Sequence, residues 1–144
     1  MTYRIEHHAG GRIEPIAPYL SDILVQLGRL VRRFPDGCTL DALFAEYLLG
    51  RRALWLVIAE DGKLAAVAMT HLRTVDATGA KVATLSDLAG SNVSDFAEDL
   101  CAAMEAWARD NGATVRQIEG RPGWAKLLAR YGYRPHAVTY RKVR

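Results

Sequence analysis

Two strand-like segments joined by a strongly periodic helical segment constrain this sequence more than any other feature. Residues 81–88 and 114–118 are strand-sized, and the residues between them follow helical spacing. The helical stripe consists of Phe96, Leu100, Met104 and Trp107. A strand–helix–strand connection within one sheet places its two strands in parallel. The sequence therefore predicts that residues 81–118 form two neighbouring, co-directional strands bridged by one helix.

The same rules of hydrophobic periodicity and turn chemistry divide the rest of the chain into predicted strands and helices. Strands are expected at 2–8, 54–59, 64–74, 81–88, 114–118 and 133–143, and helices at 18–34, 40–48, 95–110 and 124–131. Asp61-Gly62 is a hairpin turn signal, and Thr39 is placed to cap the second helix. The resulting order, β-α-α-β-β-β-α-β-α-β, predicts an α/β fold with a mixed (α+β) sheet. A three-strand antiparallel meander precedes the parallel β-α-β unit, in one domain spanning 1–144.

Composition is that of an ordinary globular protein. The chain has 144 residues, of which 50% are hydrophobic and 24% are charged, enough for one core. No apolar run approaches the roughly 20 residues that cross a bilayer. The first residues also lack the order of a secretion signal. We therefore expect a cytoplasmic protein that does not associate with membranes.

The cysteines and the charged residues indicate the redox state of the chain and the class of partner it binds. Cys38 and Cys101 are far apart and are expected to be reduced thiols. The net charge is +3, and the basic residues form small groups such as Arg29, Arg32 and Arg33. These groups read as solvated surface, with an anionic small molecule as the alternative partner. They lack the interleaved aromatic residues of a nucleic-acid surface, so nucleic acid is not expected as a partner.

The predicted order and the C-terminal motifs resemble the GNAT superfamily of acyl-CoA-dependent N-acyltransferases over nearly the whole chain. The strongest local similarity runs from Gly120 to Leu128 and then through Tyr131-Gly132-Tyr133-Arg134-Pro135, where Gly132-Tyr133 matches the Gly-aromatic step of the superfamily. The segment 105–112 is similar to the helix and turn that precede it. The sequence looks closest to short, divergent members found in phage and prophage gene clusters. The resemblance implies an acyl-CoA donor, such as acetyl-CoA, and a small-molecule or protein amine as acceptor.

The resemblance also points to a phosphate-binding loop. In the superfamily, backbone amides of a glycine-rich loop bind the CoA pyrophosphate at a helix N-terminus. The matching segment here is 88–96, which implies donor-binding residues at Leu88, Gly90, Ser91 and Asn92. The segment has no basic residue and no second glycine. Three carboxylates lie where they would repel a phosphate: Asp95 near the end of this segment, and Glu98 and Asp99 just after it. Independently of the resemblance, Arg121 lies between Gly120 and Pro122 in a later loop, where it is placed either to bind a phosphate or carboxylate or to cap a strand or helix end.

The catalytic residues that the resemblance implies are also altered. The tyrosine that protonates the departing thiolate in many members corresponds to Leu128. Glu119 is the preferred general base because it ends a parallel strand, where α/β sheets hold ligands. The other candidates for this role are Asp87, His71 and His136. No metal-ligand spacing is present in the sequence, so we expect no metal.

These observations leave two functions open. One is an N-acyltransferase with a degenerate pyrophosphate loop. The other is a non-catalytic GNAT-like binding or accessory protein of phage or prophage origin, which the same losses favour. Because fold alone does not establish activity, acetyl-CoA binding is the test that separates them. The short ending of the chain also suggests a homodimer, in which a partner subunit completes the edge of the sheet.

Overall fold

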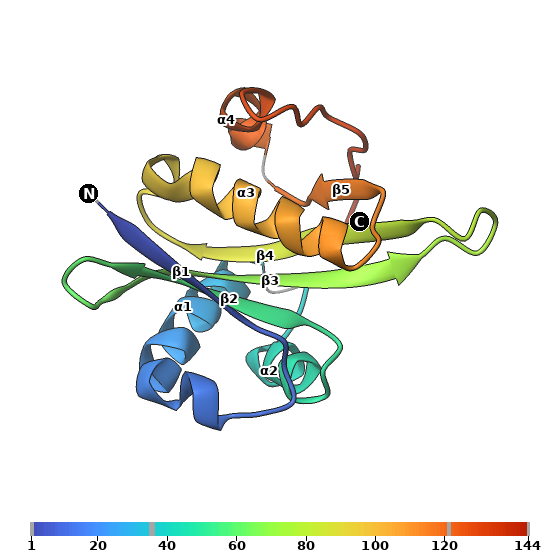
Figure 1. Cartoon of the computed structure of the whole chain (residues 1–144). Helices are drawn as coiled ribbons and strands as arrows, with labels where there is room; N and C mark the ends of the chain where they lie inside the picture. The colour runs from blue at the N-terminus through green and yellow to red at the C-terminus, as the bar shows by residue number, and fades with distance from the viewer. Residues whose placement is uncertain (1, 35–36, 121, 144) are drawn as a thin grey trace.

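A five-stranded mixed sheet forms the centre of the structure, a computed structural model that describes residues 2–34, 37–120 and 122–143 (Figure 1). The strands lie in chain order across the sheet. They are β1 (Tyr3–His8), β2 (Ala53–Ala59), β3 (Leu64–Thr74), β4 (Lys81–Gly90) and β5 (Val115–Ile118). Neighbours are antiparallel from β1 to β4, and β4 and β5 are parallel. The predicted fold class, meander and parallel pair are therefore confirmed.

Strand β2 is the most deeply buried element, as its uninterrupted apolar sequence predicts. Every residue from Ala53 to Ile58 is buried, so both faces of the strand are covered. The Asp61-Gly62 turn that follows forms as expected, with Gly62 at a φ of +82° that few other residues tolerate. The meander thus rests on one fully enclosed strand.

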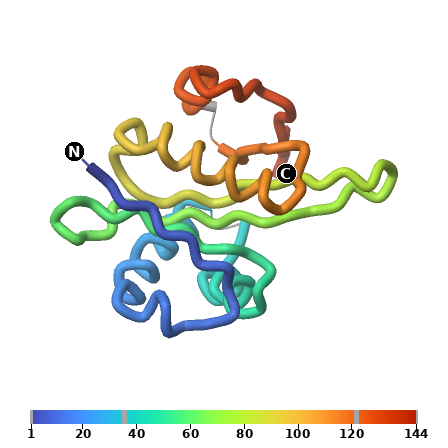
Figure 2. Tube along the Cα trace, in the orientation of Figure 1, coloured from blue at the N-terminus to red at the C-terminus, as the bar shows by residue number. Residues whose placement is uncertain are grey.

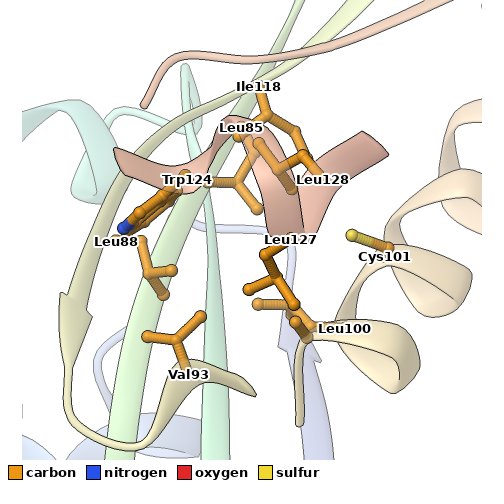
Figure 3. Close-up of a pocket in the computed structure, with 10 residues that line it drawn as sticks. Leu85, Leu88, Val93, Leu100, Cys101, Ile118, Trp124, Leu127 and Leu128 are labelled. Carbon is orange, nitrogen blue, oxygen red and sulfur yellow. The ribbon is translucent and has the colours of Figure 1, made fainter. Parts of the chain in front are cut away.

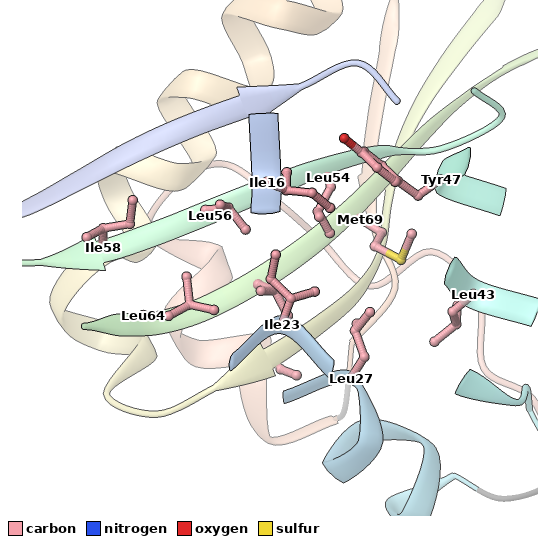
Figure 4. Packing of buried hydrophobic residues seen from close by; sticks show 12 residues of the cluster. Ile16, Ile23, Leu27, Leu43, Tyr47, Leu54, Leu56, Ile58, Leu64 and Met69 are labelled. Atoms are coloured by element: carbon pink, nitrogen blue, oxygen red, sulfur yellow. The ribbon is translucent and has the colours of Figure 1, made fainter. Parts of the chain in front are cut away.

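Helices cover both faces of the sheet, and each face has its own apolar core (Figure 1). One face packs against a 3-10 helix η1 (Glu14–Tyr19) and helices α1 (Leu20–Arg33) and α2 (Leu40–Leu48). Figure 4 shows this core, where Ile23 and Leu27 of α1 approach Met69 of β3. Thr39 caps α2 by accepting a hydrogen bond from the Ala42 amide at 3.1 Å. The expected start of the first helix at 18 is corrected, because Pro18 lies within η1.

Helix α3 (Val93–Asp110) covers the opposite face. Three members of its predicted stripe, Phe96, Leu100 and Met104, are buried against the sheet. The helix leads directly into β5, whose register runs from Val82 opposite Val115 to Leu85 opposite Ile118. Residues 81–118 therefore form the predicted strand–helix–strand unit, and this unit positions the candidate site.

The closing strand predicted at 133–143 does not form. A 3-10 helix η2 (Pro122–Trp124) and a short helix α4 (Ala125–Ala129) follow β5, and the chain then continues outside the sheet (Figure 2). Beyond the half-buried Tyr133, residues 134–143 are all exposed, with Val138 and Tyr140 at 67% and 91%, so this part of the chain buries no apolar face. Pro135 also lacks the amide that a strand pair needs. Among the described residues, no helix combines the length and apolarity needed to cross a membrane.

Candidate functional site

The two parallel strands separate part-way along β4. Strand β4 pairs with β3 as far as Gly90, but its pairing with β5 ends at Leu85. The Glu119 amide then donates a hydrogen bond to the Leu85 carbonyl at 2.9 Å, where the chain leaves β5. Residues 86–90 of β4 consequently have no strand neighbour on the β5 side within the described chain. Ligands in open α/β sheets bind where neighbouring strands part at their carboxyl ends.

An apolar cavity lies beside this separation, between β4, β5, α3 and α4 (Figure 3). It encloses about 20 Å³, close to the space of one water molecule. Its walls are Leu85, Leu88, Val93, Ala97, Leu100, Cys101, Ile118, Trp124, Leu127 and Leu128. Side chains therefore fill most of the volume between the strands on this face.

A larger cavity of about 130 Å³ continues from the first one. The two share Leu88, Val93 and Trp124 as walls. The larger cavity lies between α1 and the segment that joins β4 to α3. It is lined by Gln26, Arg29, Leu30, Arg33, Leu88, Ala89, Gly90, Ser91, Val93 and Trp124. Two exposed guanidinium groups thus stand opposite the predicted phosphate-binding loop.

Most of the donor-binding residues predicted from the resemblance lie at these cavities. Leu88 lines both, and Gly90 and Ser91 line the larger one. A Cβ at Gly90 would overlap Ala66 and approach the Ala65 carbonyl oxygen to 2.5 Å, so only glycine fits there. Asn92 lies outside both linings but begins α3 with a φ of 57° and leaves the helix without a side-chain cap. Arg121 falls outside the described residues.

The arginines of α1 are the residues that sequence reasoning missed. Gln26, Arg29 and Arg33 are spaced by three and four, so they share one helical face. This spacing was the available signal, although it could not show which element the face meets. The structure turns that face toward Gly90 and Ser91. The basic charge absent from the loop is therefore supplied from another part of the chain.

The acidic residues after the loop do not line the larger cavity. Asp95 accepts a hydrogen bond from the Tyr3 hydroxyl at 3.2 Å, which directs it toward β1. Glu98 and Asp99 are exposed on α3 and belong to neither lining. Among the described residues that line the larger cavity, the charged ones are consequently Arg29 and Arg33.

A polar cluster occupies the other face of the sheet at the same level of β4. Met69 pairs with Asp87 and Thr70 with Leu85, so Ser86 is the extra residue of a β-bulge. Arg52 Nη1 contacts Asp87 Oδ2 at 2.5 Å and Ser86 Oγ at 2.8 Å, and the Ser86 hydroxyl donates to Asp87 Oδ2 at 2.9 Å. The Arg52 and Asp87 side chains are 26% and 16% exposed, so this ion pair is largely shielded from solvent.

Three of the four candidate bases are linked electrostatically at this cluster, because the charges of Asp87 and Glu119 both act on the pKa of His71. His71 is half-buried on β3, and burial lowers its pKa below the ordinary value of 6.5. The Arg52 charge lowers the pKa further, and the carboxylates of Glu119 and Asp87 oppose that effect. The Glu119 side chain is exposed. His136 lies instead in the exposed segment after α4.

The expected position of a proton donor is apolar. Leu128, at the position where the resemblance to the superfamily implies a tyrosine, lines the small cavity (Figure 3). Tyr133 lies near Cys101 and Glu105 of α3, where burial raises its pKa. Burial likewise raises the pKa of Cys101 to about 11, so this thiol is inert at neutral pH. The described residues hold no group of three metal-ligating side chains.

Comparison with solved structures identifies the fold. The glucosamine-6-phosphate N-acetyltransferase of Arabidopsis thaliana matches with a TM-score of 0.71, 14% identity and 99% of each chain covered. A Trypanosoma brucei acetyltransferase matches with a TM-score of 0.70, 14% identity and 99% of each chain covered. An aminoglycoside N-acetyltransferase in complex with CoA matches with a TM-score of 0.64 and 16% identity, covering 98% of this chain and 95% of that one.

These similarities establish that the chain has the GNAT fold, as its motifs predict. Neither protein-family profiles nor curated protein sequences give a match. Because the sequence identities are so low, the shared property is the architecture. The activity has to be argued from the cavities and the polar cluster of this chain.

Proposed function

We propose that this chain, as a single domain spanning 1–144, transfers an acyl group from acyl-CoA to an amine. The observation that carries the proposal is the larger cavity, where Arg29 and Arg33 face Gly90 and Ser91. Guanidinium groups and unpaired helix amides both favour phosphate oxygens. Acetyl-CoA is the donor to test first, because the adjoining apolar cavity encloses only about 20 Å³.

Different residues would bind different parts of the acyl-CoA donor. Arg29 and Arg33 would bind the pyrophosphate, together with the loop residues Leu88, Gly90, Ser91 and Asn92 and with Arg121. Glycine at position 90 brings the backbone of the loop against β3, where a larger residue would not fit. The apolar walls exclude water from the thioester, whose carbonyl carbon is the electrophile in acyl transfer. Glu119 is the proposed catalytic carboxylate at the acceptor amine, on the polar side of the strand gap.

The test is titration of acetyl-CoA, followed by calorimetry and by the shift in melting temperature. At a ligand concentration of 100 times the dissociation constant, stability should rise by about 2.7 kcal/mol. We expect the double variant Arg29→Gln/Arg33→Gln to weaken binding about 100-fold or more, because it removes two charged hydrogen bonds that contribute about 1.5–3 kcal/mol each. Arg32→Gln is the matched control, since Arg32 is an exposed neighbour on α1 that lines neither cavity.

Two results would contradict the proposal. Absence of any heat or melting shift with millimolar acetyl-CoA would exclude this donor. Equal weakening by Arg32→Gln would show only a general loss of positive charge. Inorganic pyrophosphate, titrated alongside, separates anion binding at the arginines from recognition of the whole donor.

A second candidate function is supported by the narrowness of the apolar cavity. Side chains from α4 fill most of the space beside the strand gap, and Leu128 occupies the proton donor's place. Both features favour a non-catalytic GNAT-like binding or accessory protein, for which phage or prophage origin stays a hypothesis from sequence. Binding of acetyl-CoA without thiol release, across a panel of amines, would favour this function.

A further inference from the structure

Two buried polar atoms lie opposite each other across β3 and β4. His71 pairs with Thr84 in the register, so their side chains share one face of the sheet. Within the described chain, His71 Nδ1 and Thr84 Oγ1 are both buried without a hydrogen-bond partner. Thr84 is completely inaccessible to solvent. Such groups are nearly always paired in proteins, so adjacent unpaired ones call for a functional explanation.

Charged groups from several elements face this pair. Arg52 precedes β2, Asp87 lies on β4, Glu119 follows β5, and Arg73 lies farther along β3; all four act electrostatically on His71. Cys38, between α1 and α2, is coupled to Arg52 and Asp87 at the edge of the same cluster. Two carboxylates and two guanidinium groups therefore influence the charge state of this one imidazole.

The members of the cluster are not equally available to a ligand. Asp87 Oδ2 already accepts hydrogen bonds from Arg52 and Ser86. The Glu119 side chain, by contrast, is exposed. Glu119 is therefore the more accessible carboxylate for an incoming ammonium group. Its backbone is hydrogen-bonded to Leu85, next to the Thr84 that pairs with His71, and its charge acts on the His71 imidazole.

We infer that His71 accepts the proton of the acceptor amine, which binds against Glu119 on this face of the sheet. The inference rests on the proposed acyl transfer and names the proton acceptor for it. The ammonium first loses one proton to the imidazole. The neutral nitrogen then forms a bond to the thioester carbonyl carbon, and the bond between that carbon and sulfur breaks. The nitrogen's second proton ends on the departing thiolate, and the imidazolium returns its proton to water.

The surroundings of His71 suit this role. A general base works best when it is unprotonated near neutral pH and becomes stabilised once it is charged. Burial and Arg52 keep the imidazole neutral in the resting protein, because both lower its pKa. The carboxylates of Asp87 and Glu119 favour the imidazolium that forms during the transfer.

The experiment compares His71→Gln, Glu119→Gln and a control, His136→Gln, in the exposed segment after α4. Thiol release from acetyl-CoA is followed from about pH 5 to about pH 9 with spermidine, glucosamine and an α-N-blocked lysine as acceptors. The wild-type rate should fall as the pH drops through the lowered pKa of His71, since a protonated imidazole cannot take a proton. For His71→Gln we expect kcat to fall about 100-fold, with the KM for acetyl-CoA unchanged. The fall in rate at low pH (the acid limb of the pH profile) should also disappear in this variant.

Two outcomes would overturn the inference. One is His71→Gln turning over within about twofold of the wild type with the acid limb intact. If the wild type acetylates none of the amines, the same amines are titrated while the His71 imidazole signals are followed by NMR. No change at His71 would then overturn the inference, whereas a change lost in Glu119→Gln supports it. Failure of the proposed function is detected by a different experiment, the titration of acetyl-CoA into the wild type and the Arg29→Gln/Arg33→Gln variant.

Discussion

The two halves of β4 differ in their neighbours and in the residues that they carry. Residues 82–85 pair with β3 on one side and β5 on the other, and all four are buried. Residues 86–90 pair with β3 alone and present Asp87 to one face and Leu88 to a cavity on the other. A strand that loses one neighbour becomes reachable from both faces at its free edge. The candidate site therefore lies where the sheet is incomplete and the core ends.

Gly90→Ala gives the largest expected effect on stability. It tests the half of β4, residues 86–90, that pairs with β3 alone. The added Cβ would meet Ala66 and the Ala65 carbonyl, and the backbone φ of +157° disfavours a side chain. We expect the free energy of unfolding to fall by about 3 kcal/mol, measured by denaturant titration. Gly123→Ala is the control, because nothing lies within 4 Å of its Cβ. Equal effects of both changes would contradict the close approach of β4 to β3.

Asp87→Ala tests the ion pair at the bulge. Removing the carboxylate leaves the Arg52 guanidinium, only 26% exposed, without its charged partner, and Ser86 Oγ remains as a neutral one. We expect a loss of about 2 kcal/mol, below the 3–5 kcal/mol typical of fully buried pairs. A double-mutant cycle with Arg52→Ala measures the coupling between the two side chains. Additive losses in that cycle would show that the two side chains stabilise the fold independently.

Thr84→Val has the smallest expected effect and the opposite sign. It removes a buried hydroxyl that has no partner in the described chain, and valine has nearly the same shape. We expect a gain of about 1 kcal/mol in the free energy of unfolding, because the desolvation cost of that hydroxyl disappears. Ser86→Ala is the comparison, in the half of β4 that pairs with β3 alone. Its free energy of unfolding should fall by about 1 kcal/mol, because Ser86 Oγ forms hydrogen bonds with Arg52 and Asp87. A loss of stability in Thr84→Val would show that the hydroxyl is satisfied.

Local patterns predicted most of the architecture. The stripe of α3, the Thr39 cap and the Asp61-Gly62 turn depend on residues close together in sequence, and each forms as expected. The segment 133–143 has strand-type residues such as Val138 and Tyr140, but strand formation requires a partner edge. That requirement is tertiary, so composition alone overpredicted the element.

The site was harder to predict because it depends on distant contacts. Arg52 and Asp87 are 35 residues apart in the sequence. Their contact depends on a β-bulge at Ser86, which no sequence pattern predicted. The face shared by Arg29 and Arg33 could be read from their spacing, but its proximity to Gly90 required the packing of α1 on the sheet. The candidate role of Glu119 followed from strand order alone, and it stays a prediction.

The position of Trp124 has a practical consequence. Its indole forms part of the wall of both cavities and lies so near Gly120 that a Cβ there would be 2.8 Å from Cε3. Trp55 and Trp107, by contrast, pack with each other and with His7 near β1. Occupation of either cavity thus alters the surroundings of one indole while leaving the other two in place. The chain carries its own fluorescent reporter, and no label is needed to watch a molecule enter.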